Sequence, residues 1–328
     1  MRNKNVLVTG GMGYVGTVLV PRLLAEGYAV TVLDLMLYGT DLISSHEKLS
    51  LIKGDIRDQE TLRKIIPGHD AVIHLACISN DPSFELNPSL GKSINLDAFQ
   101  PLVEASEQCG VDRFIYASSS SVYGIKEEID VDESVSLEPL TDYSRFKADC
   151  ESILSNYQSD TFTTATLRPA TVCGYSRRQR LDVVVNILTN LAYHNREITV
   201  FGGDQLRPNI HISDMVDAYV HLLDAPKAAI GGEVYNAGYE NQSVFELAQI
   251  VRSVIGEDVE LKVTPTDDNR SYHISSHKIY RDIGFKAQRS IRDAVVDLRE
   301  AFDRGKLPNS LEDKRYFNIR LMQAISLQ

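Results

Sequence analysis

A tyrosine and a lysine one helical turn apart are the residues of this chain best suited to acid–base chemistry. Tyr143 and Lys147 fall in a pattern that predicts a helix over Tyr143–Asn156, and positions i and i+4 share one helix face. Alone, such a pair is usually a solvated surface feature. A phenol with a pKa of about 10 is a poor base at neutral pH, but a neighbouring ammonium and an oxidised nicotinamide would both lower that pKa.

A serine run precedes the pair. Ser118 to Ser121 follow the predicted strand Phe114–Ala117, so a serine hydroxyl at the strand end can hold a substrate oxygen near the tyrosine. Beside a nicotinamide this arrangement would place a proton acceptor next to a hydride acceptor. That combination is what the oxidation of an alcohol requires.

The start of the chain predicts a dinucleotide site. An apolar strand pattern, Asn5–Thr9, is followed by glycines at positions 10, 13 and 16 and then by a helical pattern. This spacing permits a tight turn, close approach of the backbone to a pyrophosphate, and packing of the helix on the strand. The helix N-terminus adds free N–H groups and a positive dipole end. The cofactor contacts expected here are Gly10, Gly13, Tyr14 and Val15.

Acidic residues follow the next two predicted strands. Asp34 ends Ala29–Leu33, where a carboxylate accepts hydrogen bonds from an adenosine ribose, and Leu35 in place of an arginine favours NAD over NADP. Asp55 follows Leu49–Lys53 and is expected to contact the adenine amino group. A turn or helix-cap role is the alternative for Asp55, and Asp58 is a candidate cap as well.

The alternation of strand and helix patterns predicts an α/β fold, a Rossmann doubly wound parallel sheet. Further strands are predicted at Ala71–Leu75 and Phe162–Leu167, and a further helix at Pro88–Cys109. Ligands of such sheets bind at the carboxyl ends of the strands. The polar clusters described above all fall at such ends. His74, near the end of one strand, is interpreted as a hydrogen-bonded core histidine.

Composition excludes several classes of protein. The net charge of −11 argues against a nucleic-acid binder. No apolar run reaches membrane-spanning length, and a first strand at Asn5 leaves no room for a signal peptide, so we expect a cytoplasmic protein without a membrane partner. The four cysteines show no CxxC spacing, so we expect reduced thiols and no metal site.

Together these features resemble the extended short-chain dehydrogenase/reductases of the NAD-dependent nucleotide-sugar epimerase/dehydratase family, which includes UDP-glucose 4-epimerases. The resemblance rests on Thr9 to Gly16, Asp34, Asp55-Ile56, Asn95, the serines before Val122-Tyr123-Gly124, Tyr143 to Lys147, Leu167-Arg168-Pro169 and Arg207 to Asp214. It implies catalysis by Ser119, Tyr143 and Lys147, with NAD as cofactor and a nucleotide sugar as substrate. It adds Ile56, Leu75, Ala76 and Asn95 to the cofactor contacts, beside Tyr143 and Lys147. The substrate contacts it implies are Ser120, Thr171, Arg180, Asn186, Arg207 and Arg270.

The same resemblance implies two domains and a homodimer. Residues 1–172, with a return segment near 208–240, would form the NAD-binding Rossmann domain, and residues 173–207 and 241–328 the smaller substrate domain. Relatives pair through helices that match Pro88–Cys109 and Tyr143–Asn156. The first of these carries Ile94, Phe99, Leu102 and Val103, which is more apolar surface than one buried face requires.

The expected activity is that of a 4-epimerase or C4 dehydrogenase. Thr171, Asn209 and the run Arg177 to Asp182 depart from the common pattern, and they are similar to bacterial surface-polysaccharide enzymes, including GDP-heptose C4 oxidases. The alternatives are a 4,6-dehydratase and a non-catalytic NAD(H)-binding protein. Dehydratases carry acidic residues where this chain has Ser120 and Ser121, and non-catalytic relatives typically lose the tyrosine or lysine. Surface ion pairing is the alternative role for Arg207 and Arg270, and a solvated loop charge for Arg180.

Overall fold

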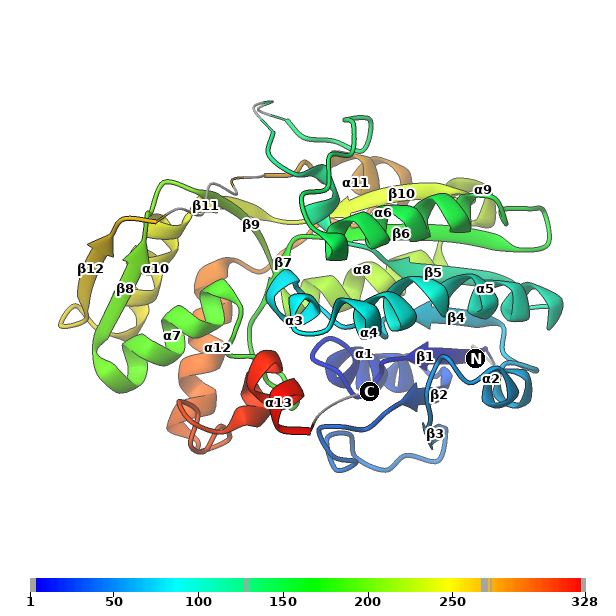
Figure 1. The fold of residues 1–328 in the computed structure, drawn as a ribbon, viewed down its shortest axis with the longest axis horizontal. Helices are drawn as coiled ribbons and strands as arrows, with labels where there is room; N and C mark the ends of the chain where they lie inside the picture. Colours follow the sequence, from blue (N-terminus) through cyan, green and yellow to red (C-terminus); the bar gives the residue numbers. More distant parts are fainter. Residues whose placement is uncertain (1–3, 127, 129, 267–270, 272, 326–328) are drawn as a thin grey trace.

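Seven strands form the central sheet of the protein (Figure 1). This computed structural model describes residues 4–126, 128, 130–266, 271 and 273–325. In spatial order the strands are β10 (Glu233–Ala237), β6 (Thr163–Pro169), β5 (Arg113–Ala117), β4 (Ala71–His74), β1 (Asn5–Thr9), β2 (Ala29–Asp34) and β3 (Leu49–Lys53). Every neighbouring pair is parallel. The predicted α/β fold with a doubly wound parallel sheet is therefore confirmed.

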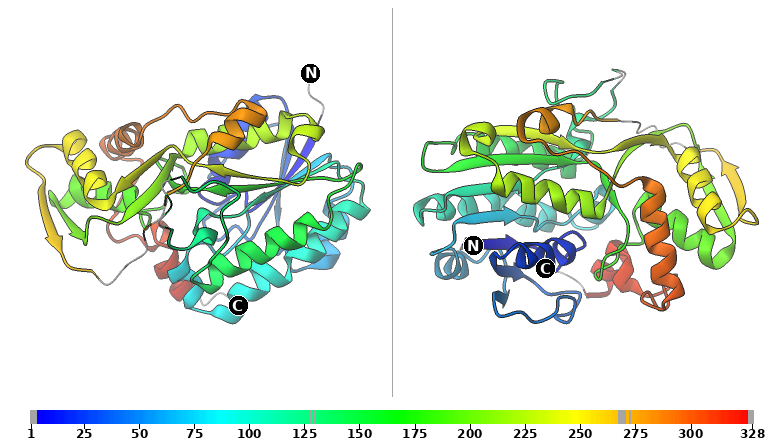
Figure 2. Two further views of the ribbon diagram at one scale, coloured as in Figure 1. Left: turned by 90° about the horizontal axis from the view of Figure 1, so that it is seen from above. Right: turned by 180° about the vertical axis from the view of Figure 1, so that it is seen from behind.

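Helices cover both faces of this sheet, because its strands are apolar on both sides. In β1, Val6 and Val8 belong to one hydrophobic cluster and Leu7 to the other. The first face carries α1 (Gly16–Ala25), α8 (Ile212–Asp224) and α11 (His277–Ile283). The second face carries α2 (Gln59–Ile65), α5 (Phe99–Gln108) and α6 (Asp142–Ser155), and Figure 2 shows the two layers on either side of the sheet.

The helix predicted over Pro88–Cys109 contains a change of helical type. It comprises α4 (Pro88–Lys92), a π-helical turn (Ser93–Asp97) and α5. Asn95 is buried in this turn, where its amide accepts a hydrogen bond from the Ile78 N–H at 2.8 Å and donates one to the Ile78 carbonyl at 2.9 Å. π-Helical turns often occur at functional positions, and this one brings an amide to the loop after β4.

A smaller group of elements lies beyond the carboxyl ends of the central strands (Figure 1). The parallel strands β8 (Glu197–Phe201) and β12 (Glu260–Thr264) pack with α7 (Val184–Asn195), α10 (Val244–Ile255) and α12 (Ile291–Asp303) around their own apolar cluster. A second sheet contains β11 (Glu240–Ser243), β9 (Leu206–His211) and β7 (Thr171–Cys173). The short helices are α3 (Asp81–Glu85), α9 (Lys227–Ile230) and α13 (Asn318–Ile325). None of the described helices combines the length and apolar character needed to cross a membrane.

A buried ion pair ties α6 to the central sheet. Glu151 of α6 and Arg168 of β6 make a two-point contact, with Nη2 to Oε2 at 2.6 Å and Nε to Oε1 at 3.0 Å. The Ser118 hydroxyl also donates to Glu151, and Arg168 donates to the Tyr123 hydroxyl at 2.7 Å. This network fixes α6, β6 and the end of β5 relative to one another.

Arg168→Met should destabilise the protein strongly, because it leaves the Glu151 carboxylate buried without its counter-ion. We expect a loss of about 3–5 kcal/mol in the free energy of unfolding, the usual range for a broken buried pair. The double variant Arg168→Met/Glu151→Leu leaves no unpaired charge, so it should be more stable than Arg168→Met alone. Urea unfolding of the three proteins measures these differences. A double variant less stable than Arg168→Met would contradict this account.

Candidate active site

A cavity of about 390 Å³ lies at the carboxyl ends of the central strands, walled by the segments that follow β1 to β6. Of the expected cofactor contacts it is lined by Gly10, Gly13, Tyr14, Val15, Asp34, Asp55, Ile56, Leu75, Ala76, Tyr143 and Lys147. It is also lined by Ser119, Ser120, Thr171 and Arg180. The structure thus brings most of the expected cofactor, catalytic and substrate residues into one cavity.

The glycine-rich loop lies along one part of this cavity. Gly10 has φ of 74°, and a Cβ added there would lie 2.6 Å from the Ala76 backbone nitrogen, so the loop passes too close to β4 for a larger residue. A Cβ at Gly16 would lie 2.5 Å from Gly11 Cα, so α1 begins directly against the loop. At Gly13 the nearest atom would be the Gly10 oxygen at 3.1 Å, and Gly13 lines the cavity. An anion in the cavity can therefore reach the N-terminus of α1.

Asp34 ends β2 with both carboxylate oxygens held by the backbone. Oδ2 accepts a hydrogen bond from the Met12 N–H at 3.0 Å, and Oδ1 accepts one from the Met36 N–H at 2.7 Å. Burial raises the pKa of Asp34, while these two N–H groups oppose the rise. Each oxygen keeps a lone pair for a ribose hydroxyl. The carboxylate thus fits the adenosine part of a dinucleotide, where its charge would repel a 2′-phosphate.

Asp55 is held in place by the side chain of Arg57, whose Nη2 lies 2.7 Å from Oδ2. Burial alone would raise the pKa of Asp55, but Arg57 outweighs burial and the pKa is lowered. Asp55 lines the cavity beside Ile56. Its contact with adenine stays a prediction. Asp58, in contrast, caps α2 by accepting two N–H groups of the first turn, as predicted.

Ser119, Tyr143 and Lys147 meet in the same cavity. Ser119 follows β5, and its Oγ accepts the Ser121 N–H at 3.1 Å. Tyr143 and Lys147 lie one turn apart in α6, as the i, i+4 spacing predicts. Lys147 Nζ donates to the Ala117 carbonyl at 2.6 Å and lies 5.9 Å from the centre of the Tyr143 ring. A hydroxyl, a phenol and an ammonium therefore surround one space.

The environment of Tyr143 opposes ionisation. Burial raises its pKa well above the ordinary value, and the nearby Cys77 and Asp81 add to the rise, whereas Arg180 opposes it. The sequence predicts a lowered pKa from Lys147 and an oxidised nicotinamide. In the protein alone burial outweighs the cations of the chain, and the lowering of the pKa beside a bound oxidised nicotinamide stays a prediction.

Asn186 is not a cavity residue, contrary to the expectation that it binds substrate. It is fully buried. Its Oδ1 accepts the Gly174 N–H at 3.0 Å, and its Nδ2 donates to the Tyr14 hydroxyl at 3.0 Å and the Arg180 carbonyl at 2.8 Å. With these groups occupied, Asn186 supports the walls of the cavity.

Arg207 is also absent from the described cavity wall. It lies on β9 and donates to the Leu206 carbonyl at 3.0 Å. Arg270 lies outside the described residues. Of the three arginines expected to contact the substrate, Arg180 lines the cavity, where its Nη1 donates to Ser79 at 3.2 Å.

Two residues near β4 support the site from outside the cavity. Asn95 is not among the residues that line it, and both ends of its amide are bound to Ile78, which holds the loop after β4 in place. Its contact with the cofactor stays a prediction. His74 shares a hydrogen bond with the Thr9 hydroxyl at 2.7 Å. Burial lowers the pKa of His74 to about 3, so its interpretation as a neutral core histidine is confirmed.

Several cavity residues were not expected from the sequence. Cys77 and Asp81 follow β4, and both lie near Tyr143. Arg178 belongs to the run of arginines that the sequence singled out, yet it had no assigned contact. Asn318 reaches the cavity from α13, and no motif in that region indicates it.

Comparison with known proteins agrees with this geometry. The model of the NAD dependent epimerase/dehydratase family matches residues 6–238. The chain is 30% identical to the dTDP-D-glucose 4,6-dehydratase of Homo sapiens over 84% of each chain. It is 27% identical to the UDP-glucose 4-epimerase of Lactobacillus helveticus, over 94% of this chain and 99% of that one. An uncharacterized protein, y4nG of Sinorhizobium fredii, is 34% identical, but the match spans 76% of this chain and 60% of the relative.

A solved structure shows the same similarity in three dimensions. MoeE5 in complex with UDP-glucuronic acid and NAD is 27% identical and superposes with a TM-score of 0.80, over 92% of this chain and 99% of that chain. The cavity described above, with Gly13 and the carboxylate of Asp34 in its wall, fits a dinucleotide. The chain therefore belongs to the NAD dependent epimerase/dehydratase family, and its cofactor is NAD.

Proposed function

We propose that this protein oxidises the C4 hydroxyl of a nucleotide-linked sugar, as a 4-epimerase or a C4 dehydrogenase. The observation that carries the proposal is the convergence of Ser119, Tyr143 and Lys147 on the cavity that also contains the dinucleotide residues. The similarity to a UDP-glucose 4-epimerase and to MoeE5, solved with UDP-glucuronic acid, supports a nucleotide sugar as substrate. At positions 171 and 209 the chain carries Thr171 and Asn209, in which it is similar to enzymes of surface-polysaccharide synthesis. This similarity supports a role in supplying sugars for such polymers.

Each reactive side chain has one task in this mechanism. Bound NAD would accept the hydride from sugar C4. Ser119 Oγ holds the C4 oxygen and Tyr143 takes its proton. Burial holds the pKa of Tyr143 high, so ionisation depends on positive charge nearby. Arg180 and Lys147, the latter 5.9 Å from the ring centre, would supply part of that charge, and an oxidised cofactor would add to it. An epimerase would turn the keto sugar and reduce its other face, whereas a dehydrogenase would release it.

Tyr143→Phe should fold and bind NAD but lose at least about a hundredfold in turnover, the scale of a positioned acid–base group. The ring remains, and the proposed proton acceptor is gone. Stopped-flow absorbance of the reduced cofactor, with saturating nucleotide sugar, measures the rate. Tyr157→Phe is the matched control, because Tyr157 bonds Glu104 away from the cavity and should react at the wild-type rate. Near-native turnover by Tyr143→Phe would show that another group takes the proton.

The alternative activity is 4,6-dehydration, and one observation favours it. Dehydration needs a proton donor for the leaving C6 hydroxyl and a base for the C5 proton. The sequence has Ser120 and Ser121 where dehydratases carry acidic residues, and it indicates no other residue for these two tasks. The structure adds Asp81, which lines the cavity near Tyr143 and accepts a hydrogen bond from Thr141 at 2.6 Å. A carboxyl group is therefore present, in a different segment from the one that dehydratases use.

We nevertheless expect the sugar to keep its C6 oxygen, because a serine hydroxyl is far too weak an acid to replace the carboxyl groups missing at Ser120 and Ser121. Chromatography coupled to mass spectrometry, after incubation with NAD and UDP-, GDP- or dTDP-sugars in D₂O, should show either a separated C4 epimer of unchanged mass or a 4-ketose lighter by two hydrogens, in both cases without deuterium at C5. A product lighter by one water would overturn this proposal. Loss of that product in Asp81→Asn would then assign the acid–base role to Asp81.

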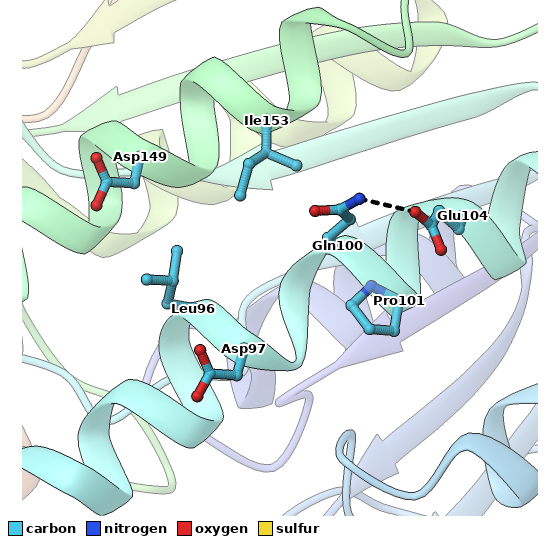
Figure 3. Close-up of a pocket in the computed structure, with 7 residues that line it drawn as sticks. All are labelled: Leu96, Asp97, Gln100, Pro101, Glu104, Asp149 and Ile153. Atoms are coloured by element: carbon cyan, nitrogen blue, oxygen red, sulfur yellow. Dashed lines mark hydrogen bonds between the residues drawn. The ribbon is translucent and has the colours of Figure 1, made fainter.

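We also propose a homodimer that pairs through α5 and α6. The sequence argument for it is wrong in one respect, since Ile94, Phe99, Leu102 and Val103 are all buried within one chain. The outer face instead carries a groove of about 580 Å³ between the helices (Figure 3). Its lining consists of Leu96, Asp97, Gln100, Pro101, Glu104, Asp149 and Ile153. Leu96 and Ile153 point into the space between the two helices, where the same groove of a second copy could meet them.

Ile153→Asp should convert the dimer to a monomer, because it places a carboxylate among Asp97, Glu104 and Asp149 at the apolar part of the groove. Light scattering at micromolar concentration measures the mass. Ser155→Asp, at an exposed position of the same helix, should leave the mass unchanged. A wild-type protein with the mass of one chain would contradict the proposal.

A further inference from the structure

Arg178 lies in the cavity wall with an incompletely satisfied guanidinium group. The residue is 4% exposed, and its Nη2 donates to Asn318 Oδ1 at 2.5 Å. Its plane lies over the Tyr38 ring, 3.7 Å from the ring centre. Nε and Nη1 are buried, and they have no hydrogen-bond partner in the part of the chain that the structure describes. Two donors of a buried cation therefore have no partner within the described part of the chain.

Arg180, two residues further along, is a buried arginine whose charge is matched. Its Nε donates to Asp182 at 2.8 Å. Burial alone would lower the pKa of both arginines. At Arg180 the adjacent Asp182 reverses this effect and the pKa is raised, whereas at Arg178 burial prevails and the pKa is lowered. Because a buried charge without a counter-ion is costly, Arg178 is poised to receive an anion.

The segment that carries Arg178 is docked on the glycine-rich loop. The Ser176 hydroxyl donates to the Tyr14 carbonyl at 2.8 Å and shares a hydrogen bond with the Thr17 hydroxyl at 2.7 Å. The backbone N–H of Arg178 lies 3.4 Å from Thr17 Oγ1. Since Thr17 is in the first turn of α1, the backbone of Arg178 lies next to the helix end that Gly13 and Tyr14 expose to the cavity. An anion bound there would meet the helix dipole, in the same cavity that the side chain of Arg178 lines.

We propose that Arg178 binds the diphosphate of the dinucleotide through the donors that the protein leaves unpaired. Arginine suits this task because its planar, permanently charged group donates several hydrogen bonds to phosphate oxygens. Tyr38 and Asn318 act as positioning residues, since one packs on the guanidinium and the other fixes Nη2. A nucleotide sugar carries the same diphosphate. The contacts of this segment with Tyr14 and Thr17 favour the cofactor as its source.

The proposal is tested by ligand binding to the full chain freed of nucleotide, so it does not depend on the C4 chemistry. In Arg178→Gln, calorimetry should show about ten- to a hundredfold weaker binding of NAD, ADP-ribose and ADP, the range for a lost hydrogen bond to a charged group. Adenosine, which lacks phosphate, should bind as it does to the wild type. With NAD saturating, the affinity for UDP should not change. Arg178→Lys should recover part of the loss.

Thermal melting distinguishes a purely structural role of Arg178 from a role in binding the diphosphate. Arg178→Gln removes an unmatched buried charge, so its Tm without nucleotide should equal or exceed that of the wild type, while the rise in Tm on adding NAD should shrink. Arg177→Gln, at the exposed neighbour that donates to the Asp41 carbonyl, should match the wild type throughout. An unchanged NAD affinity, an equal loss for adenosine, a lower Tm without nucleotide, or a loss confined to UDP would each overturn the proposal. The last result would assign Arg178 to the substrate diphosphate.

Discussion

The ion pair between Glu151 and Arg168 is the interaction on which the placement of the reactive groups depends. Glu151 lies on the same helix as Tyr143 and Lys147, two turns beyond the tyrosine and one turn beyond the lysine, so fixing Glu151 on β6 fixes them. The Ser118 hydroxyl bonds the same carboxylate, which ties the residue before Ser119 to the pair. Taking two charges out of water is costly. That cost is offset by several hydrogen bonds, and these permit few alternative positions of α6.

A second constraint joins the two groups of elements across the cofactor site. The Tyr14 hydroxyl of the glycine-rich loop donates to the Gly174 carbonyl at 2.7 Å. The Asn186 side chain is hydrogen-bonded to both residues, through the Gly174 N–H and the Tyr14 hydroxyl. The same loop touches the backbone at Ala76 so closely that Gly10 cannot carry a side chain. Segments distant in sequence therefore meet at the loop. Changes in the smaller group of elements are expected to reach the cofactor through these contacts.

Local pattern was sufficient to predict the parts of the site that follow directly from one strand or one helix. The glycine loop, Asp34 and the Tyr143/Lys147 pair needed only spacing within a single element. Amide side chains were harder, because an asparagine can bind a ligand or the backbone equally well. Asn95 and Asn186 both bind the backbone. Long-range contacts could not be predicted from local pattern. Tyr38 donates a hydrogen bond to Asn318, 280 residues away in sequence, and no periodicity of the sequence indicates that contact.

Charge balance within the cavity links the geometry to both ligand binding and chemistry. Asp55 is paired with Arg57, and Asp182 with Arg180. Two cations of the described cavity wall have no carboxylate partner: Arg178, which donates to the Asn318 amide, and Lys147, which donates to the Ala117 carbonyl. A diphosphate would bring negative charge to the first, and the phenolate of Tyr143 would create it beside the second. The fold thus leaves positive charge without a carboxylate partner at the two places where the proposed diphosphate contact and the proposed proton transfer would each supply a negative charge.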